Sequence, residues 1–389
     1  MIDYQSVLNK EIRQLKPSGI RRFFDIANEM ENVISLSIGE PDFSTPWHVR
    51  QEGIKSLEDG KTWYSPNRGF IELREEICRW LKRRYHIEYE AKTDVVVTVG
   101  GSEAIDLCIR CLINPGEEVL IPEPSFVCYR PLTEMAGGVP ITIETKQEDQ
   151  FRLTAKALRE KITPKTKLLI LPFPNNPTGA VMRRKNLEEI AEVVRENDLL
   201  VLSDEIYSEL TYGDTRHVSF AAIEGMKERT VVVNGFSKAF AMTGWRLGYA
   251  VGPKEIVGQM TKLHQYGIMS APTMAQYAAI EALKNGDGDI DEMREQYDMR
   301  RRLIVDGFNS MGLTCFEPEG AFYVFPCIKK TGMTSQAFCE KLIYAEHVAV
   351  VPGDAFGSCG EGYVRVSYSY SIKHITEAMS RIGHFLKSL

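Results

Sequence analysis

Short runs of consecutive apolar residues alternate along the chain with segments in which apolar residues recur every three or four positions. Continuous runs are typical of strands that helices cover on both faces, and the wider spacing is typical of an amphipathic helix. The segment 185–196 carries such a stripe, formed by Leu187, Ile190, Ala191 and Val194. The alternation predicts an α/β fold with a largely parallel sheet. The runs expected to be strands are 95–99, 118–121, 168–171, 199–202, 230–233 and 248–251.

The pattern changes after about residue 285. The stretch Asn285-Gly286-Asp287-Gly288-Asp289 has the composition of a loop, and a long charged helix is expected from about 290 to 311. The rest of the chain predicts a smaller α+β unit, and a strand at 33–37 could pack against either part. The expected elements of this unit are strands at 321–325, 348–351 and 363–367 and helices at 334–345 and 372–386.

Composition excludes several classes of protein. Of the 389 residues, 43% are apolar, which is enough to fill a core and excludes global disorder. The formal net charge of -6 argues against a nucleic-acid-coating role. No apolar run approaches the ~18 residues that a membrane-spanning helix needs. The first residues lack the basic start and apolar stretch of a secretory signal, so we expect a cytoplasmic protein with no nucleic-acid or membrane partner.

The cysteines and histidines give no sign of a disulfide framework or a metal site. The eight cysteines are scattered, which fits reduced thiols. Cys108 and Cys111 have the spacing of a redox motif, but both fall inside a helical pattern, so packing within a helix is the favoured interpretation. The seven histidines are dispersed and form no H-x-x-x-H pair, and we therefore expect no metal.

Four features that could carry chemistry each follow a predicted strand, where open α/β sheets place their ligands. Gly100-Gly101-Ser102 links a strand to a helix, and glycines at a helix N-terminus suit a phosphate. A plain turn with Ser102 as N-cap is the alternative. Asn175-Asn176 offers two amides that could donate to an anionic or phenolic oxygen, or could form an ordinary turn.

The other two features are ionisable. Asp204 ends a buried strand, where a carboxylate is costly unless it faces a cation or caps a helix. Lys238 lies among apolar and aromatic residues with Arg246 eight positions later, although it could also be a surface lysine. Burial and a nearby cation lower the pKa of an amine and make it nucleophilic toward a carbonyl. A phosphate-binding turn, an amide, a carboxylate and an activated amine are together what a pyridoxal phosphate site needs.

These motifs resemble those of a known family. The segments Ser237-Lys238 with Thr243-Gly244-Trp245-Arg246, Asn176-Pro177-Thr178-Gly179 and Asp204-Glu205-Ile206-Tyr207 are similar to those of fold-type I pyridoxal phosphate enzymes of the class I/II aminotransferases. The resemblance covers nearly the whole chain, and the similar bacterial enzymes are aspartate, aromatic and N-acetyl-diaminopimelate aminotransferases.

The resemblance implies both an architecture and an activity. It implies a large domain at 46–284 with a mainly parallel seven-stranded sheet, and a smaller α+β domain made of 1–45 and 285–389. The implied activity moves an amino group from an L-amino acid to a 2-oxo acid by a ping-pong mechanism, with pyridoxal phosphate as cofactor.

A role is implied for each matching residue. Lys238 corresponds to the Schiff-base lysine that also moves the substrate proton, and Asp204 to the partner of the pyridine nitrogen. Tyr207 and Asn176 correspond to donors to the phenolic oxygen. The implied substrate contacts are Arg365 as the clamp on the α-carboxylate, Gly39 and Asn176. The other implied cofactor contacts are Gly101, Ser102, Ser237 and Arg246 at the phosphate, Phe126 stacked on the ring, and Tyr64 reaching the site of the neighbouring subunit in a homodimer.

Two positions depart from many relatives. Gly235 stands where many have a phosphate-binding serine. Ser102 stands where many aspartate-specific relatives have a lysine, which weakens an aspartate assignment and leaves it open. A β-lyase acting on cystathionine-like substrates and a non-catalytic aminotransferase-like binding module are the alternatives. The candidates for the side-chain pocket are Tyr266, His264 and Ile20, and the candidate lid is Pro17 to Phe24.

Overall fold

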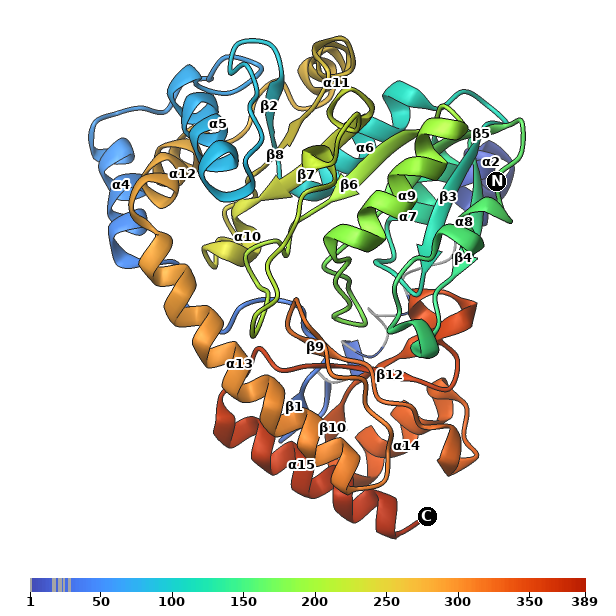
Figure 1. The fold of residues 1–389 in the computed structure, drawn as a ribbon. Helices are drawn as coiled ribbons and strands as arrows, with labels where there is room; N and C mark the ends of the chain where they lie inside the picture. The colour runs from blue at the N-terminus through green and yellow to red at the C-terminus, as the bar shows by residue number, and fades with distance from the viewer. Residues whose placement is uncertain (1, 16–18, 20–22, 24, 27–28) are drawn as a thin grey trace.

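A seven-stranded sheet lies at the centre of the computed structural model, which describes residues 2–15, 19, 23, 25–26 and 29–389 (Figure 1). The strand order is β2-β8-β7-β6-β5-β3-β4, and all neighbours are parallel except β8, which is antiparallel to β2 and β7. The mainly parallel sheet is thereby confirmed, although the apolar runs did not single out β4. The strands are β2 (Val95–Thr98), β3 (Glu118–Glu123), β4 (Val139–Glu144), β5 (Thr166–Leu171), β6 (Leu200–Asp204), β7 (Thr230–Gly235) and β8 (Gly248–Val251).

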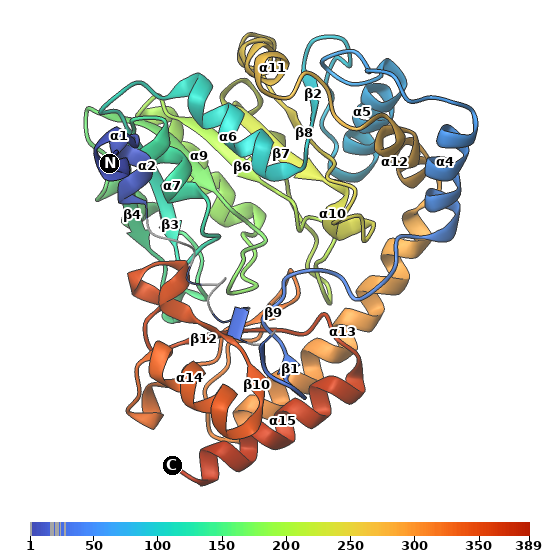
Figure 2. The ribbon, with the colours of Figure 1, turned by 180° about the vertical axis from the view of Figure 1, so that it is seen from behind.

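Helices cover both faces of this sheet, which explains why its inner strands carry apolar residues toward both faces (Figures 1 and 2). In β5, Leu168 and Ile170 belong to the apolar cluster under α6, whereas Leu169 and Leu171 belong to the cluster under α9. The predicted stripe of α9 is part of the second cluster. The covering helices are α4 (Trp47–Glu58), α5 (Ile71–Tyr85), α6 (Gly101–Leu112), α7 (Tyr129–Met135), α8 (Ala155–Arg159), α9 (Arg184–Glu196), α10 (Phe236–Ala239), α11 (Lys254–Gly267) and α12 (Thr273–Asn285).

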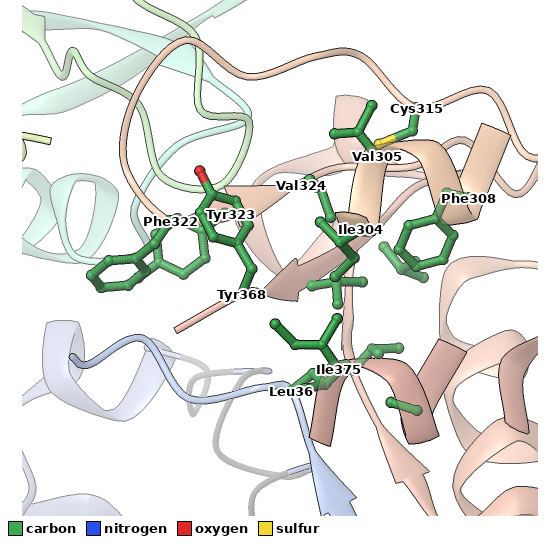
Figure 3. Packing of buried hydrophobic residues seen from close by; sticks show 14 of the residues in the cluster. Leu36, Ile304, Val305, Phe308, Cys315, Phe322, Tyr323, Val324, Tyr368 and Ile375 are labelled. Atoms are coloured by element: carbon green, nitrogen blue, oxygen red, sulfur yellow. The ribbon is translucent and has the colours of Figure 1, made fainter. Parts of the chain in front are cut away.

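A second group of elements lies below the sheet in Figure 1. Its three-stranded antiparallel sheet has the order β11-β12-β9, and β1 pairs with β10 in parallel. Figure 3 shows Leu36, Ile304, Val324 and Ile375 in the apolar cluster that joins these elements. The elements are β1 (Ile34–Ser35), α13 (Asp287–Ser310), β9 (Tyr323–Val324), α14 (Ser335–Glu346), β10 (Val348–Ala349), β11 (Val351–Pro352), β12 (Val364–Ser367) and α15 (Ile372–Lys387).

The predicted loop at 285–289 is wrong. Asn285 ends α12 and Asp287 already begins α13, so that only Gly286 lies between the two helices. A Cβ atom at Gly286 would come within 2.6 Å of the carbonyl oxygen of Ala282, so a glycine is needed where the chain turns. Asp287 and Asp289 lie in the first turn of α13, where negative charge is favoured. The acidic, glycine-containing sequence is therefore a helix start rather than a loop.

Two further predictions can be compared with the described residues. The predicted strand at 348–351 is divided into β10 and β11 with Val350 between them. Of the predicted lid at 17–24, only Gly19 and Phe23 lie among the described residues, so the lid stays a prediction, as do the domain boundaries at 46 and 285. No helix in the described ranges is long and apolar enough to cross a membrane. The short helices are α1 (Tyr4–Val7), α2 (Lys10–Gln14) and the 3-10 helices Gln147–Asp149, Phe220–Ala222, Lys227–Arg229, Lys329–Thr331, Gly353–Phe356 and Ser358–Gly360.

Candidate active site

A cavity of about 400 Å³ lies where the carboxyl ends of the central strands face the second group of elements. Its volume falls within the ~300–1,000 Å³ that is usual for small-molecule sites. Of the residues for which the resemblance implies a cofactor or α-carboxylate contact, only Tyr64 does not line it. These lining residues are Gly39, Gly101, Ser102, Phe126, Asn176, Asp204, Tyr207, Ser237, Lys238, Arg246 and Arg365.

Lys238 projects into this cavity from α10, directly after β7. Its Nζ donates a hydrogen bond to the carbonyl oxygen of Gly39 at 2.6 Å. Burial lowers the pKa of Lys238 to about 8, and the positive charges of Arg365 and Arg246 act in the same direction against the opposing charge of Glu40. About a tenth of this amine is therefore uncharged at pH 7, far more than for an ordinary lysine, and a nucleophilic amine must be uncharged.

Asp204 ends β6 with its carboxylate in the same cavity. Tyr129 donates to its Oδ2 at 2.7 Å, and the backbone N–H of Ile206 donates to its Oδ1 at 3.2 Å. Burial raises the pKa of Asp204 to about 6 despite these two donors. The ionised form of a carboxylate buried in this way is stabilised by a cation placed against it, such as a protonated ring nitrogen.

The turn between β2 and α6 lets other groups come close to its backbone. Gly100 has a φ of +78° and precedes Gly101, the first residue of α6. A Cβ at Gly100 would lie 2.6 Å from Nη2 of Arg246, so the guanidinium packs directly on the turn. Ser102 is the second residue of the helix and not its N-cap, so the capping interpretation was wrong. A helix N-terminus beside an arginine and the hydroxyls of Ser102 and Ser237 is a suitable cradle for a phosphate.

Gly235, where many relatives have a serine, lies in tightly packed surroundings. A Cβ there would lie 3.0 Å from Cα of Gly248 and 3.1 Å from the carbonyl oxygen of Leu247. The neighbouring strand β8 thus comes too close to β7 for a larger residue to enter without adjustment. The missing serine hydroxyl is accounted for by packing between strands.

Arg365 lies on β12 and is 3% exposed. Its Nη1 donates to Oδ1 of Asn176 at 3.0 Å and its Nη2 donates to the carbonyl oxygen of Ser37 at 2.5 Å. Its Cζ lies 4.5 Å from the ring centroid of Tyr323 and 4.8 Å from that of Phe356. Its Nε is buried and has no hydrogen-bond partner among the described residues. A buried cation with an unused donor beside a cavity is suited to a carboxylate ligand.

Three sequence candidates lie outside the cavity of their own chain. Tyr64 is 77% exposed and Tyr266 is 84% exposed, and neither contributes to its lining. The expectation that His264 lines the side-chain pocket is wrong, because His264 is fully buried on α11 and its Nδ1 lies 2.7 Å from Oε1 of Glu103 on α6. Ile20 lies outside the described residues.

Two tyrosines of the site escaped the sequence patterns. Tyr129, which bonds Asp204, is the first residue of α7, and its ring meets that of Phe126 edge-on. Tyr323 lies in the predicted strand 321–325, and its hydroxyl is 2.8 Å from that of Tyr207. Both looked like core residues, because a buried hydroxyl leaves no trace in the apolar pattern.

The CxxC cysteines have the packing role that was favoured. Cys108 is fully buried in the cluster under α6, and Cys111 packs against the same cluster. Burial raises the pKa of the Cys111 thiol to about 11 and that of Cys108 further. Both thiols are therefore protonated near neutral pH and poorly reactive.

Comparison with known proteins agrees with this geometry. The sequence profile of the family described as "Aminotransferase class I and II" matches residues 31–382. The chain is 47% identical to an aspartate aminotransferase of Pyrococcus abyssi over 375 residues, which are 96% of each chain. It is 45% identical to aromatic-amino-acid aminotransferase 2 of Thermococcus litoralis over 382 residues, 98% of each chain. The crystal structure of an aromatic aminotransferase from Pyrococcus horikoshii superposes with a TM-score of 0.91 at 47% identity, covering 94% of this chain and 99% of the other.

Proposed function

Because the chain belongs to the class I and II aminotransferases and is therefore an enzyme of the transaminase type, we propose that it uses pyridoxal phosphate to move the amino group of an L-amino acid to a 2-oxo acid. The observation that carries the proposal is the lining of one cavity by the amine of Lys238, the carboxylate of Asp204 and the guanidinium of Arg365. Each of these groups suits a different part of the reaction.

The residues present fit the cofactor. Pyridoxal phosphate supplies an aldehyde that bonds to amines and a ring that withdraws electrons from the substrate α-carbon. The start of α6, Arg246 and Ser237 would hold its phosphate, and Asp204 would keep its ring nitrogen protonated. Phe126 would lie against the ring. Tyr207 and Asn176 would donate to its phenolic oxygen.

Lys238 is the proposed base. With its pKa lowered to about 8 by burial, its Nζ would hold the cofactor through the aldehyde in the resting enzyme, and its free amine would take the proton from the α-carbon of the amino acid. Its hydrogen bond to Gly39 uses one N–H and leaves the lone pair of the uncharged amine available. The amino group stays on the enzyme when the first 2-oxo acid leaves, so the kinetics are ping-pong.

The substrate is held by its α-carboxylate. Arg365 would bind it through Nε and a neighbouring N–H, with Gly39 and Asn176 close by. The names of the relatives suggest an acidic or an aromatic side chain on the amino donor. A panel that includes aspartate, phenylalanine and tyrosine, with 2-oxoglutarate or pyruvate as acceptor, decides between these.

The complete site is proposed to need two copies of the chain. Tyr64 is 77% exposed and lies outside its own cavity, which is consistent with a tyrosine that reaches the phosphate of a neighbouring subunit. The proposal is therefore a homodimer whose large domain spans 46–284 and whose smaller domain, 1–45 with 285–389, carries the lid. A cytoplasmic location is proposed with it, since all eight cysteines are free thiols.

The test compares the wild-type enzyme with Lys238→Ala. The wild type should bind pyridoxal phosphate, show a visible absorbance band that borohydride bleaches, and give parallel reciprocal plots with two substrates. Loss of a general base costs ~10²–10⁴-fold, so Lys238→Ala should lose at least that in kcat. Near-normal turnover of this variant would contradict the assignment. Release of pyruvate and ammonia without an acceptor would indicate a lyase instead.

A further inference from the structure

Tyr323 on β9 lies next to Arg365 on β12. In the register of these antiparallel strands Tyr323 pairs with Ser367, and Arg365 lies two residues before Ser367. Residues two apart on a strand share a face, so the tyrosine ring and the guanidinium emerge side by side. The Cζ of Arg365 is 4.5 Å from the centroid of the Tyr323 ring. The ring of Phe322 packs against that of Tyr323, with ring centroids 4.9 Å apart, and Figure 3 shows both residues in the apolar cluster.

The hydroxyl of Tyr323 reaches a second functional residue. It lies 2.8 Å from the hydroxyl of Tyr207, and both side chains are buried, with 1% and 5% exposure. The same hydroxyl packs against Gly39, where a Cβ atom would come within 2.2 Å of it. Tyr323 therefore contacts three residues that have separate tasks in the proposed reaction.

We propose that Tyr323 is a positioning residue that acts through two of these contacts. Its hydroxyl directs the O–H of Tyr207 toward the phenolic oxygen of the cofactor, and its ring holds the guanidinium of Arg365 flat for the substrate carboxylate. This inference rests on the proposed function, because both tasks presuppose bound pyridoxal phosphate and an amino acid substrate.

The first task follows from the number of protons available. Two hydroxyls in contact share a single hydrogen bond, so one of them donates and the other keeps its own proton free. When Tyr323 donates to the oxygen of Tyr207, the proton of Tyr207 is free to point at the cofactor. A hydrogen bond that a group accepts also strengthens the one that it donates, by ~10–30% per bond. Tyr323 thus makes Tyr207 a better donor without touching the cofactor.

The second task follows from the shape of the guanidinium. Arg365 uses Nη1 and Nη2 on Asn176 and on the carbonyl oxygen of Ser37, and these in-plane bonds leave movement perpendicular to the guanidinium plane to be limited by packing. The rings of Tyr323 and Phe356 provide that packing. A cation lying on an aromatic face away from water is also stabilised by the ring itself.

Two variants separate the two tasks. Tyr323→Phe removes the hydroxyl and keeps the ring, whereas Tyr323→Leu removes both. The first measurement is the pH midpoint of the visible absorbance band of the pyridoxal-phosphate-loaded enzyme. The second is the dissociation constant of 3-phenylpropanoate, a carboxylate that has no amine and therefore cannot react. Dissociation of pyridoxal phosphate on dialysis is followed in parallel.

We expect the two measurements to respond differently. A donor to the phenolic oxygen lowers the midpoint, so Tyr323→Phe should raise it by ~0.2–0.5 unit and leave the binding of 3-phenylpropanoate within about twofold of wild type. Tyr323→Leu should raise the midpoint similarly and weaken binding by roughly 5- to 30-fold. An unchanged midpoint in Tyr323→Phe, or unchanged binding in Tyr323→Leu, would overturn the corresponding half of the inference.

Two further variants identify the cause of any change. Tyr212→Phe removes another buried hydroxyl from this neighbourhood, one that donates to the carbonyl oxygen of Ala321 and does not reach Tyr207. Its midpoint should stay at the wild-type value, and an equal shift would mean that Tyr323→Phe acts through general loosening. Tyr207→Phe should raise the midpoint by ~1–2 units. An unchanged midpoint in Tyr207→Phe would contradict the proposed role of Tyr207. A raised midpoint in Tyr207→Phe together with an unchanged midpoint in Tyr323→Phe would contradict only the role inferred for Tyr323.

Discussion

Replacement of Arg365 by lysine tests how the site recognises its substrate. The guanidinium is buried between the rings of Tyr323 and Phe356, and two of its nitrogens bond Asn176 and the carbonyl oxygen of Ser37. Its Nε has no partner among the described residues. Lysine keeps the positive charge but loses the planar fork that binds both oxygens of a carboxylate. The substitution therefore removes geometry while leaving charge in place.

The expected loss can be worked from these contacts. A hydrogen bond to a charged group contributes about 1.5–3 kcal/mol. Loss of one of the two bonds to the carboxylate should therefore lower kcat/KM by roughly 10- to 150-fold, at about 1.4 kcal/mol for each factor of ten. The α-carboxylate carries the same charge in the ground state and in the transition state of proton transfer. Most of the loss should therefore appear as a higher KM, with kcat changed much less.

The assay is steady-state transamination with one amino donor over a range of concentrations, together with the dissociation constant of 3-phenylpropanoate. Arg300→Lys is the matched control, because Arg300 is also a buried arginine stacked on two rings, those of Phe43 and Tyr297, and lies outside the cavity. A large fall in kcat with KM unchanged would refute the reasoning, as would equal losses in the two variants.

Three other substitutions give expected outcomes of different kinds. Asp204→Asn should keep a visible absorbance band but lower kcat by at least ~10²-fold, because an amide cannot keep the ring nitrogen protonated; single-turnover absorbance measures this. Burial raises the pKa of Glu319, but hydrogen bonds from Arg183 and Arg152 outweigh burial and lower this pKa. The ion pairs of Glu319 therefore stabilise the fold above pH ~4.5. Glu319→Gln should therefore lower the thermal midpoint at pH 7, and the difference from wild type should shrink as the pH falls below ~4.5. For His48, burial is outweighed by bonds to Asp289 and a second carboxylate, which raise its pKa. His48→Gln should therefore lower the thermal midpoint most below pH ~6.5, and its effect should fade as the pH rises through the folded-state pKa of His48. Thermal melts of both proteins across this pH range measure the difference.

The sequence predicted the central sheet because strands covered on both faces must be apolar at every position. That signal failed for β4, whose pattern Val139-Pro-Ile-Thr-Ile-Glu144 includes a proline and polar residues. β4 is an edge strand whose residues are mostly only partly buried, so it does not need to be apolar on both faces. The apolar signal was therefore clear in the inner strands and in the buried edge strand β2, and weak in β4.

The sequence could reveal those site residues whose type is unusual beside a buried strand. A lysine and an aspartate directly after apolar strands are conspicuous, and both line the cavity. Tyr129 and Tyr323 are not conspicuous, because tyrosine is also an ordinary core residue and its partners lie far away in the sequence. His264 was a wrong candidate for the side-chain pocket, because it is buried in the core and paired there with Glu103.

The N-terminal segment around Ser37 and Gly39 connects the parts of this site in a way that no local pattern could predict. The backbone of Leu36 bonds Ala349 on one side and Ser367 on the other, so the segment is tied to the strands that carry Arg365. A few residues later, Gly39 accepts the hydrogen bond of Lys238, which belongs to the central sheet. Movement of the second group of elements relative to the sheet would therefore lengthen or break a contact of the reactive amine. Because that contact holds the Nζ of Lys238 in place, the position of this segment and the orientation of the amine are expected to change together.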